Sequence, residues 1–346
     1  MNTVKHTPIL LSILKWLGIS LAALLGLVAL ILLLVHLFTP VVYNDFYKDA
    51  KKEYKIPGLA DGFIPQGFAY AQEEKVYLQC GYMKDDSASR IYVLPQGNEK
   101  KGARFVTLQT PDGTAYTGHT GGITTNGTLV WLANDGEGED NCVWIFELSA
   151  ILQAENGSAL KVERRFYPES RAAYCHVEGD YLWVGEFHRP VDYPTKESHA
   201  FDVSADVTNR ALICAYRLDA SAPGGVVEDA PEMLLSVTDH VQGFTRTPDG
   251  TFVLSTSYGL ATSHLLFYRD VTGEAADATL AINGRDVPVW YLDQEALTKD
   301  LEFAPMSEEP LLLNGRIYVL TESASQKYIF GNFTRGRHVY SIPVEE

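Results

Sequence analysis

The chain has 346 residues, of which 46% are hydrophobic and 21% are charged, a balance typical of a globular protein with one large core or two modest ones. Its formal net charge of −16 argues against nucleic acid and anionic lipid as partners, because both would be repelled. The four cysteines fit neither a zinc motif nor a dense disulfide framework. Each cysteine lies in or beside an apolar run, so we expect buried thiols.

An uncharged run, Leu17 to Val35, opens the chain. At 1.5 Å per residue it reaches roughly 28 Å as a helix, enough to cross a bilayer core. Lys5 and Lys15 precede the run, and the first charge after it is Asp45. The positive-inside rule therefore predicts a cytoplasmic N-terminus with the rest of the chain outside.

A cleaved signal peptide is the competing interpretation of this run. The run continues as VHLFTPVVYND, which offers a poor cleavage site. We therefore predict a single-pass protein of the cell membrane. Its parts are a cytoplasmic segment at 1–16, a signal anchor at 17–38, a linker at 39–55 and an extracytoplasmic domain at 56–346.

The domain contains an internal repeat. The segment Gln66 to Leu94, which begins QGFAYAQEEKVYLQ, aligns without a gap with Gln242 to Asp270, which begins QGFTRTPDGTFVLS. An offset held across a whole unit is typical of repeat architectures. In each Gln-Gly-Phe start, we expect the glycine to let inner strands approach closely at a crowded axis.

Reading the repeat outward gives five units of short apolar runs separated by turns. The second strand of each unit has one template: VYLQ, VWLA, LWVG, FVLS and IYVL. The predicted outer strands of the first four units are Phe105–Gln109, Val162–Phe166, Met233–Val237 and Val287–Leu292. The fifth unit lacks an outer strand, and the segment around Tyr54–Ile56 would supply it and close the ring.

This pattern predicts an all-β fold, a β-propeller of five four-stranded blades behind one transmembrane helix. Six blades is the alternative, if the insertions hide a degenerate unit. A pair of β-sandwiches is the other fold considered, and the aligned repeat argues against it.

Propeller geometry places two sets of loops on one face, around the channel mouth. These are the loops from each outer strand to the next inner strand and the loops from second to third strands. His119, Glu186, His188 and Arg189 fall in them and are the candidate catalytic residues. Imidazole and carboxylate suit zinc or iron, so His119, Glu186 and His188 are also candidate ligands of a divalent metal, although their spacing matches no metal motif.

Other polar side chains are candidates for ligand binding at the same mouth. They are Gln66, Arg90, Arg171, Gln242, Tyr258, Glu322 and Lys327. The acidic loop Asp135 to Asp140 is more typical of a solvated turn than of a calcium loop. The insertion Phe187 to Arg210 is too long for a tight turn, and we expect it to cover the mouth as a lid.

The Gln-Gly-Phe starts and the segments GYMKDDSASR and SYGLATSH resemble membrane-anchored, uncharacterised propeller proteins of Gram-positive bacteria. More distantly, the pattern resembles gluconolactonase-like and calcium-dependent phosphotriesterase propellers. That resemblance implies the fold over roughly residues 56–346. The calcium ligands of those hydrolases are not carried over, because the inner strands here begin with Gln66, Thr120, Ala172 and Gln242.

Two functions follow. One is a tethered propeller that binds a small molecule, a saccharide or a protein. The alternative is a metal-dependent hydrolase or lyase with its site at the channel mouth. No GxSxG motif, SxxK motif or phosphate-binding glycine loop supports nucleophilic or nucleotide chemistry.

Overall fold

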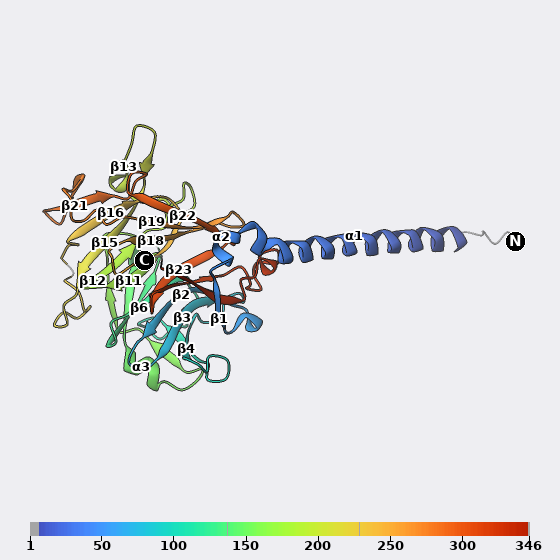
Figure 1. Cartoon of the computed structure of the whole chain (residues 1–346). Coiled ribbons are helices and arrows are strands. Elements are labelled where there is room, and N and C mark those ends of the chain that lie inside the picture. The colour runs from blue at the N-terminus through green and yellow to red at the C-terminus, as the bar shows by residue number, and fades with distance from the viewer. Residues whose placement is uncertain (1–6, 137, 228, 345–346) are drawn as a thin grey trace.

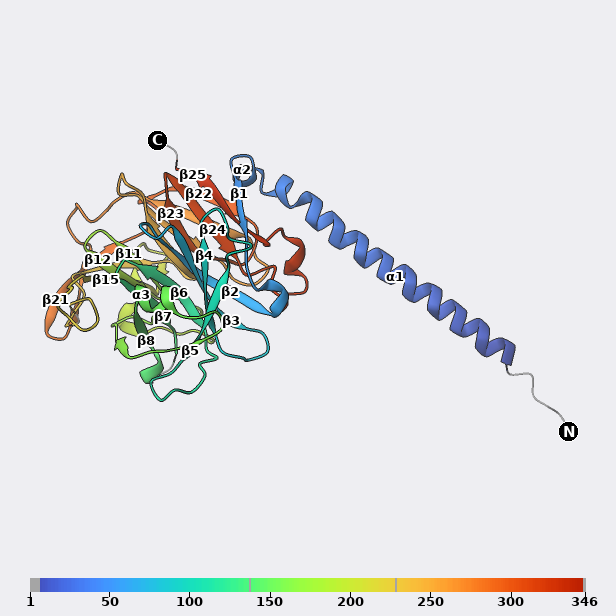
Figure 2. The ribbon, with the colours of Figure 1, turned by 90° about the horizontal axis from the view of Figure 1, so that it is seen from below.

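Each of the five sequence units folds into an antiparallel sheet, and the sheets stand around one axis as propeller blades (Figures 1 and 2). The computed structural model describes residues 7–344 except 137 and 228. From inner to outer strand, the first blade consists of β2 (Phe63–Ala71), β3 (Val76–Met83), β4 (Arg90–Pro95) and β5 (Arg104–Gln109), and the second consists of β6 (Thr120–Thr125), β7 (Leu129–Asn134), β8 (Cys142–Glu147) and β10 (Arg164–Phe166). The third blade consists of β11 (Tyr174–Glu178), β12 (Tyr181–Gly185), β15 (Ala211–Arg217) and β16 (Met233–Val237), and the fourth consists of β17 (Val241–Arg246), β18 (Phe252–Thr256), β19 (Ser263–Tyr268) and β22 (Leu297–Phe303). The fifth blade consists of β23 (Ser307–Leu313), β24 (Arg316–Thr321), β25 (His338–Pro343) and β1 (Lys51–Lys55).

The ring closes as predicted, with both ends of the domain in one blade. Strand β1 pairs antiparallel with β25 and supplies the outer strand of the fifth blade. The buried Tyr54 and Ile56 anchor this segment against the first and fifth blades. The prediction of a closing strand around Tyr54–Ile56 is therefore confirmed, and the strand begins earlier than expected.

One predicted outer strand is wrong. The run Val287–Leu292 falls in β21 (Arg285–Tyr291), which pairs parallel with β16 and, together with β20 (Ala278–Ile282), widens the third blade. The outer strand of the fourth blade is instead β22, whose sequence LTKDLEF is half polar. An outer strand buries only one face, so its apolar residues alternate with polar ones and it lacks a continuous apolar run.

The core consists of apolar layers between neighbouring blades. On β7, Trp131 packs against the third blade, whereas Val130 and Leu132 pack against the first. This alternation explains why the second-strand template is apolar at consecutive positions, because both faces of each blade are covered. All four cysteines are buried and free, as predicted.

The N-terminal helix α1 (Thr7–Val42) projects from the propeller (Figure 1). Its segment Leu11–Val42 is long and apolar enough to cross a membrane. A short helix, α2 (Asn44–Tyr47), then turns the chain back onto the fourth blade, where the Phe46 ring stacks on the Phe303 ring at 4.9 Å. This stacking holds the C-terminal end of α1 against the rim of the propeller.

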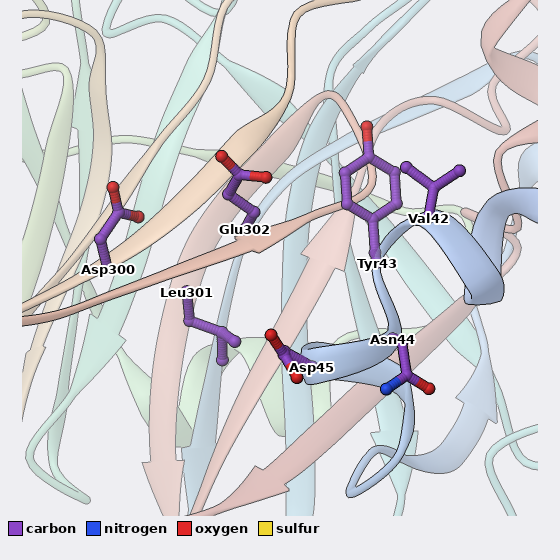
Figure 3. Close-up of a pocket in the computed structure, with 7 residues that line it drawn as sticks. All are labelled: Val42, Tyr43, Asn44, Asp45, Asp300, Leu301 and Glu302. Carbon is purple, nitrogen blue, oxygen red and sulfur yellow. The ribbon is translucent and has the colours of Figure 1, made fainter.

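Figure 3 shows a shallow pocket of about 340 Å³ at this junction, between the end of α1 and β22. The carboxylates of Asp300 and Glu302 point to the same side as the Tyr43 hydroxyl. That hydroxyl lies 3.3 Å from Thr262 Oγ1, in the loop between β18 and β19. Helix α1 therefore meets the propeller beside a loop of the mouth face.

Candidate functional site at the channel mouth

Four of the five inner strands, β2, β6, β17 and β23, carry a register irregularity near the channel mouth. In β2 the extra residue is Gln66, and in β17 it is Gln242, the repeated glutamines of the sequence. In β23 the same irregularity falls at Glu308 and Glu309. A bulge re-aims the side chains of a strand, so these amide and carboxyl groups leave the regular alternation of the sheet.

Glu309 lies at the axis and contacts the inner strands of the other blades. Its Oε2 accepts a hydrogen bond from the Ile123 backbone N–H at 3.1 Å. A methyl group on Gly67 would lie 2.5 Å from Oε2, and one on Gly122 would lie 3.0 Å from Oε1. The glycines at the strand starts thus make room for the Glu309 carboxyl, which explains the Gln-Gly-Phe pattern.

Burial raises the pKa of Glu309 well above its usual range, although hydrogen bonds from the backbone of Ile123, Phe68 and Cys175 oppose the shift. Its Oε1 is buried and has no hydrogen-bond partner within the described part of the chain. Both observations favour a protonated, neutral side chain at pH 7.

Glu308 and Glu322 form a pair of carboxyl groups just above this level. Gln66 Nε2 donates a hydrogen bond to Glu322 Oε2 at 2.9 Å. Burial raises the pKa of Glu322 to about 7. Burial, and then the proximity of the carboxyl groups of Glu322 and Glu309, raise the pKa of Glu308 well above its usual range. At neutral pH the pair therefore holds a proton, and it can both donate and accept hydrogen bonds.

A cation and two rings border this pair. Lys327 Nζ donates to the Tyr82 hydroxyl at 2.6 Å and lies 4.8 Å from the centre of the same ring. The Tyr82 ring lies 4.9 Å from the His119 ring. The surrounding protein, and then the Lys327 charge, lower the pKa of His119 to about 4, so its imidazole is neutral although the side chain is open to solvent. This side of the mouth therefore combines one lysine, an imidazole, a phenol and the carboxyl pair of Glu308 and Glu322.

The fourth blade and the lid loop supply the opposite side. The Arg189 guanidinium lies 4.1 Å from the centre of the Tyr258 ring, which stacks on His240 at 5.4 Å. Arg189 also forms an ion pair with Asp192. Nδ1 of His188 lies 3.0 Å from Thr195 Oγ1, so this histidine contacts the lid loop, the insertion Phe187 to Arg210.

Glu186 anchors the lid loop from below. Both of its oxygens lie 3.0 Å from Nδ1 of the fully buried His199, and they also accept the backbone N–H groups of Arg171 and Leu212. His199 Nε2 lies 3.4 Å from Glu169 Oε1. Burial alone would lower the pKa of His199, but the hydrogen bonds to Glu169 and Glu186 outweigh it and raise the pKa to about 9.

A pocket of about 470 Å³ opens beside this network. Its lining includes Arg171, Glu186 and Lys196. Arg171 is paired with Asp135 at 2.6 Å, and Lys196 is paired with Glu169. Because these charges are matched within the protein, the pocket offers few free groups to a ligand. Glu137, part of the acidic loop considered for calcium, lies outside the described residues.

The structure thus divides the predicted residues. Gln66, Glu322, Lys327 and His119 meet at one side of the mouth, Arg189 and Tyr258 meet at another, and Arg171 and Glu186 line the side pocket. Gln242 donates weakly to Ser257, at 3.4 Å to its hydroxyl. Arg90 lies apart, with its guanidinium 4.2 Å from the centre of the Phe105 ring.

The proposed metal ligands each have other contacts. His119 lies against Tyr82, Glu186 bonds His199, and His188 bonds Thr195. Over residues 7–344, without 137 and 228, no group of three or more His, Cys, Asp or Glu side chains is placed to hold a metal ion. The metal site therefore stays a prediction that composition suggested and that metal analysis has to test.

Sequence reasoning missed Glu308 and Glu309. A signal for both was present, because β23 occupies the place in its unit that the Gln-Gly strands occupy in theirs. The fifth unit carries Glu308-Glu309-Pro310 there, without glycine, so the repeat did not reveal the match. His199 pairs with Glu186 only through the path of the lid loop, which spacing does not show.

No protein-family model matches the sequence, and no curated protein matches it. Solved structures with a similar fold include an exo-β-1,3-galactanase from Phanerochaete chrysosporium, with a TM-score of 0.46 and 11% identity over 86% of this chain and 64% of the galactanase chain. This chain therefore spans less than two thirds of the galactanase.

Two other similar structures contain sugar-related enzymes. One is a PQQ-bound aldose sugar dehydrogenase from Streptomyces coelicolor, with a TM-score of 0.43 and 12% identity over 86% of this chain and 98% of that one. The other is a gluconolactonase from Xanthomonas campestris, with a TM-score of 0.36 and 11% identity over 86% and 96%. These similarities agree with a distant propeller resemblance, and at such scores they carry no argument about activity.

Proposed function

We propose that this protein is a membrane-tethered propeller that binds a hydroxyl-rich ligand, a saccharide or saccharide-like headgroup, at its channel mouth. In this proposal α1 is an uncleaved anchor, the N-terminus is cytoplasmic and the propeller is outside. The observation that carries the proposal is the set of groups around Glu322. A carboxyl with a pKa near neutrality, held by Gln66, stands near a lysine and a solvent-open imidazole.

The chemistry of these groups suits sugar hydroxyls. A hydroxyl group both donates and accepts hydrogen bonds, and a pair of carboxyl groups with one proton can also do both. The exposed rings at the rim, Tyr258 and Tyr193, offer faces for the apolar side of a sugar ring. The loops that carry these groups are mounted on a rigid ring of strands.

A hydrolase or lyase remains the second candidate, and one observation favours it. Burial raises the pKa of both Glu308 and Glu322, so the pair can hold one proton, and one carboxyl can then act as an acid while the other acts as a base. This version needs no metal. The metal-dependent version would require Glu186 to leave His199, whereas Nε2 of His188 is buried without a hydrogen-bond partner among the described residues.

The test is a glycan-array screen of the full chain in detergent, followed by calorimetric titration of any hit. Glu322→Gln and Lys327→Met should each weaken binding about tenfold or more, since a hydrogen bond to a charged group contributes roughly 1.5–3 kcal/mol. Glu74→Gln, on the exposed turn at the far end of β2 and β3, is the control. Equal affinity in all three variants would overturn the assignment of the mouth as the binding site, and product formation would favour the enzyme.

A further inference from the structure

Exposed apolar side chains of the propeller gather on the mouth face. Outside α1, eight large apolar or aromatic residues in the described chain are more than 40% exposed. Six of them lie in loops between the second and third strands of the third, fourth and fifth blades: Val191, Tyr193, Tyr258, Leu260, Ile329 and Phe330. Val207 lies instead on a hairpin that packs beside Tyr268 and Leu297, away from the mouth. Apolar groups concentrated on one face of a protein mark a contact with a partner or a membrane.

The anchor helix leaves from this same face. His36 Nδ1 lies 3.3 Å from the Phe333 carbonyl oxygen, and Arg335 Nε donates to the His36 carbonyl at 3.0 Å. Figures 1 and 2 both show α1 running away from the side of the propeller at which β2 begins and the loop after β24 lies. The mouth face is therefore turned toward the N-terminal part of α1, where the membrane would be.

The loop after β24 extends alongside the apolar part of the helix. A groove of about 900 Å³ is lined by Ala29 and Leu33 of α1 and by Ile329 of the loop. Ala29 precedes Val35, the end of the uncharged run, by about 9 Å of helix. If the helix spans the bilayer, Ile329 and Phe330, which are 69% and 65% exposed, lie within the outer edge of the hydrocarbon layer. Interfacial protein segments typically insert about 5–10 Å, which matches this depth.

The charge of the groove fits lipid headgroups. The whole chain carries a net charge of −16, yet this groove is lined by Lys52, Lys84, Arg335 and Arg337, by two histidines, and by no acidic residue. Basic side chains near an anionic surface each contribute roughly 1 kcal/mol of attraction. The sequence-based exclusion of anionic lipid therefore does not hold for this part of the surface.

From these observations we propose that the mouth face lies on the outer surface of the membrane, with Ile329 and Phe330 inserted and the basic groove on anionic headgroups. This rests on the proposed function, in which α1 is a membrane anchor and the mouth is the binding site. Glu322, Lys327 and Tyr328 share the loop of Ile329, so the mouth opens next to the lipid surface. Its ligand is then the polar headgroup of an amphiphile held in the bilayer, which reaches the site without crossing free solvent.

The test places a polarity-sensitive fluorophore on single introduced cysteines of the full chain in lipid nanodiscs. The four native cysteines are buried, so labelling is selective. Phe330→Cys reports on the loop, Glu74→Cys on the far end of the propeller, and Gly26→Cys on the helix, where a side chain meets no other atom within 4 Å. We expect blue-shifted emission and quenching by nitroxide-bearing lipid at positions 26 and 330, but not at 74. We also expect a larger shift at 330 when phosphatidylglycerol is added to phosphatidylcholine.

Each other outcome overturns a defined part of the proposal. A lipid signal at position 26 with a solvent signal at 330 would refute contact of the mouth face with the membrane and leave the anchor in place. A solvent signal at both positions would refute the anchor itself. A shift at 330 that depends on protein concentration and not on nitroxide lipid would identify a second copy as the partner. A shift that ignores phosphatidylglycerol would remove the role of the basic groove.

Discussion

The substitution Gly67→Ala tests how closely the inner strands pack around the axis of the propeller. The new methyl carbon would lie 2.5 Å from Glu309 Oε2, 2.8 Å from Gly122 Cα and 2.9 Å from the Ile123 nitrogen. Two of these neighbours are backbone atoms of β6 and cannot rotate away. The substitution therefore has to displace a strand of the second blade, the Glu309 carboxyl, or both.

The expected loss of stability has two parts. Overpacking of a filled core costs about 1–3 kcal/mol. Displacement of Glu309 breaks its hydrogen bond to Ile123 N–H and leaves a buried donor unpaired, which adds about 1–3 kcal/mol. Together they give roughly 2–6 kcal/mol, or a fall in melting temperature of about 4–12 °C at roughly 2 °C per kcal/mol for a domain of this size.

The measurement is thermal unfolding of the full chain in detergent, followed by near-ultraviolet circular dichroism. Gly273→Ala is the matched control, because a methyl group there meets no atom within 4 Å and the backbone is not left-handed. It should change the melting temperature by about 1 °C or less. If Gly67→Ala and Gly273→Ala melt together, the close packing of strands around Glu309 is refuted.

Four further predictions concern the titratable groups and the lid. The folded pKa of Glu322 is raised from 4.5 to about 7, so ionisation of Glu322 destabilises the fold as pH rises through that window. Relative to the wild type, Glu322→Gln should therefore stabilise the protein more at pH 8 than at pH 5, as measured by parallel thermal melts. An unchanged pH profile of the melting temperature would contradict the raised pKa of Glu322. The pKa of His199 is raised to about 9. Its contribution to the stability of the fold is therefore complete below the unfolded pKa of about 6.5 and is lost as pH rises through 9. Limited proteolysis of the lid loop should accelerate between these two pH values. Glu186→Gln should make the lid loop sensitive to proteolysis already at pH 7, because the substitution removes the buried charged partner of His199. If the lid loop stays resistant in this variant, contacts other than the Glu186–His199 pair hold it in place. His119→Ala should leave the metal content of protein purified without chelator unchanged, and a stoichiometric metal lost on this substitution would favour the metal-dependent hydrolase.

Much of the architecture could be predicted from the sequence because the repeated residues are those that the packing of strands and blades requires. The glycines at positions 67 and 243 are needed where strands crowd the axis, and the apolar second-strand template follows from burial on both faces. Strand β22 was missed because an outer strand needs only alternate apolar residues, and LTKDLEF does not stand out from a loop. The parallel pairing of β21 with β16 depends on the path of an insertion, for which no local pattern exists.

The site was predictable in part. Loop position alone correctly brought Gln66, Glu322, Lys327 and His119 to one side of the mouth. Loop position could not show that Glu186 contacts His199, because that contact depends on how the lid loop folds back. Nor could it show the protonation of Glu308 and Glu322, since a raised pKa arises from burial and from a neighbouring charge in three dimensions.

The most direct measurement of the central claim is native mass spectrometry of the full chain, released in mild detergent from the membrane in which it was made. If the mouth binds a hydroxyl-rich headgroup, the protein should carry an added mass that Glu322→Gln and Lys327→Met each reduce and that Glu74→Gln leaves in place. An added mass retained by both mouth variants, or reduced equally by Glu74→Gln, would contradict the assignment of the channel mouth as the binding site.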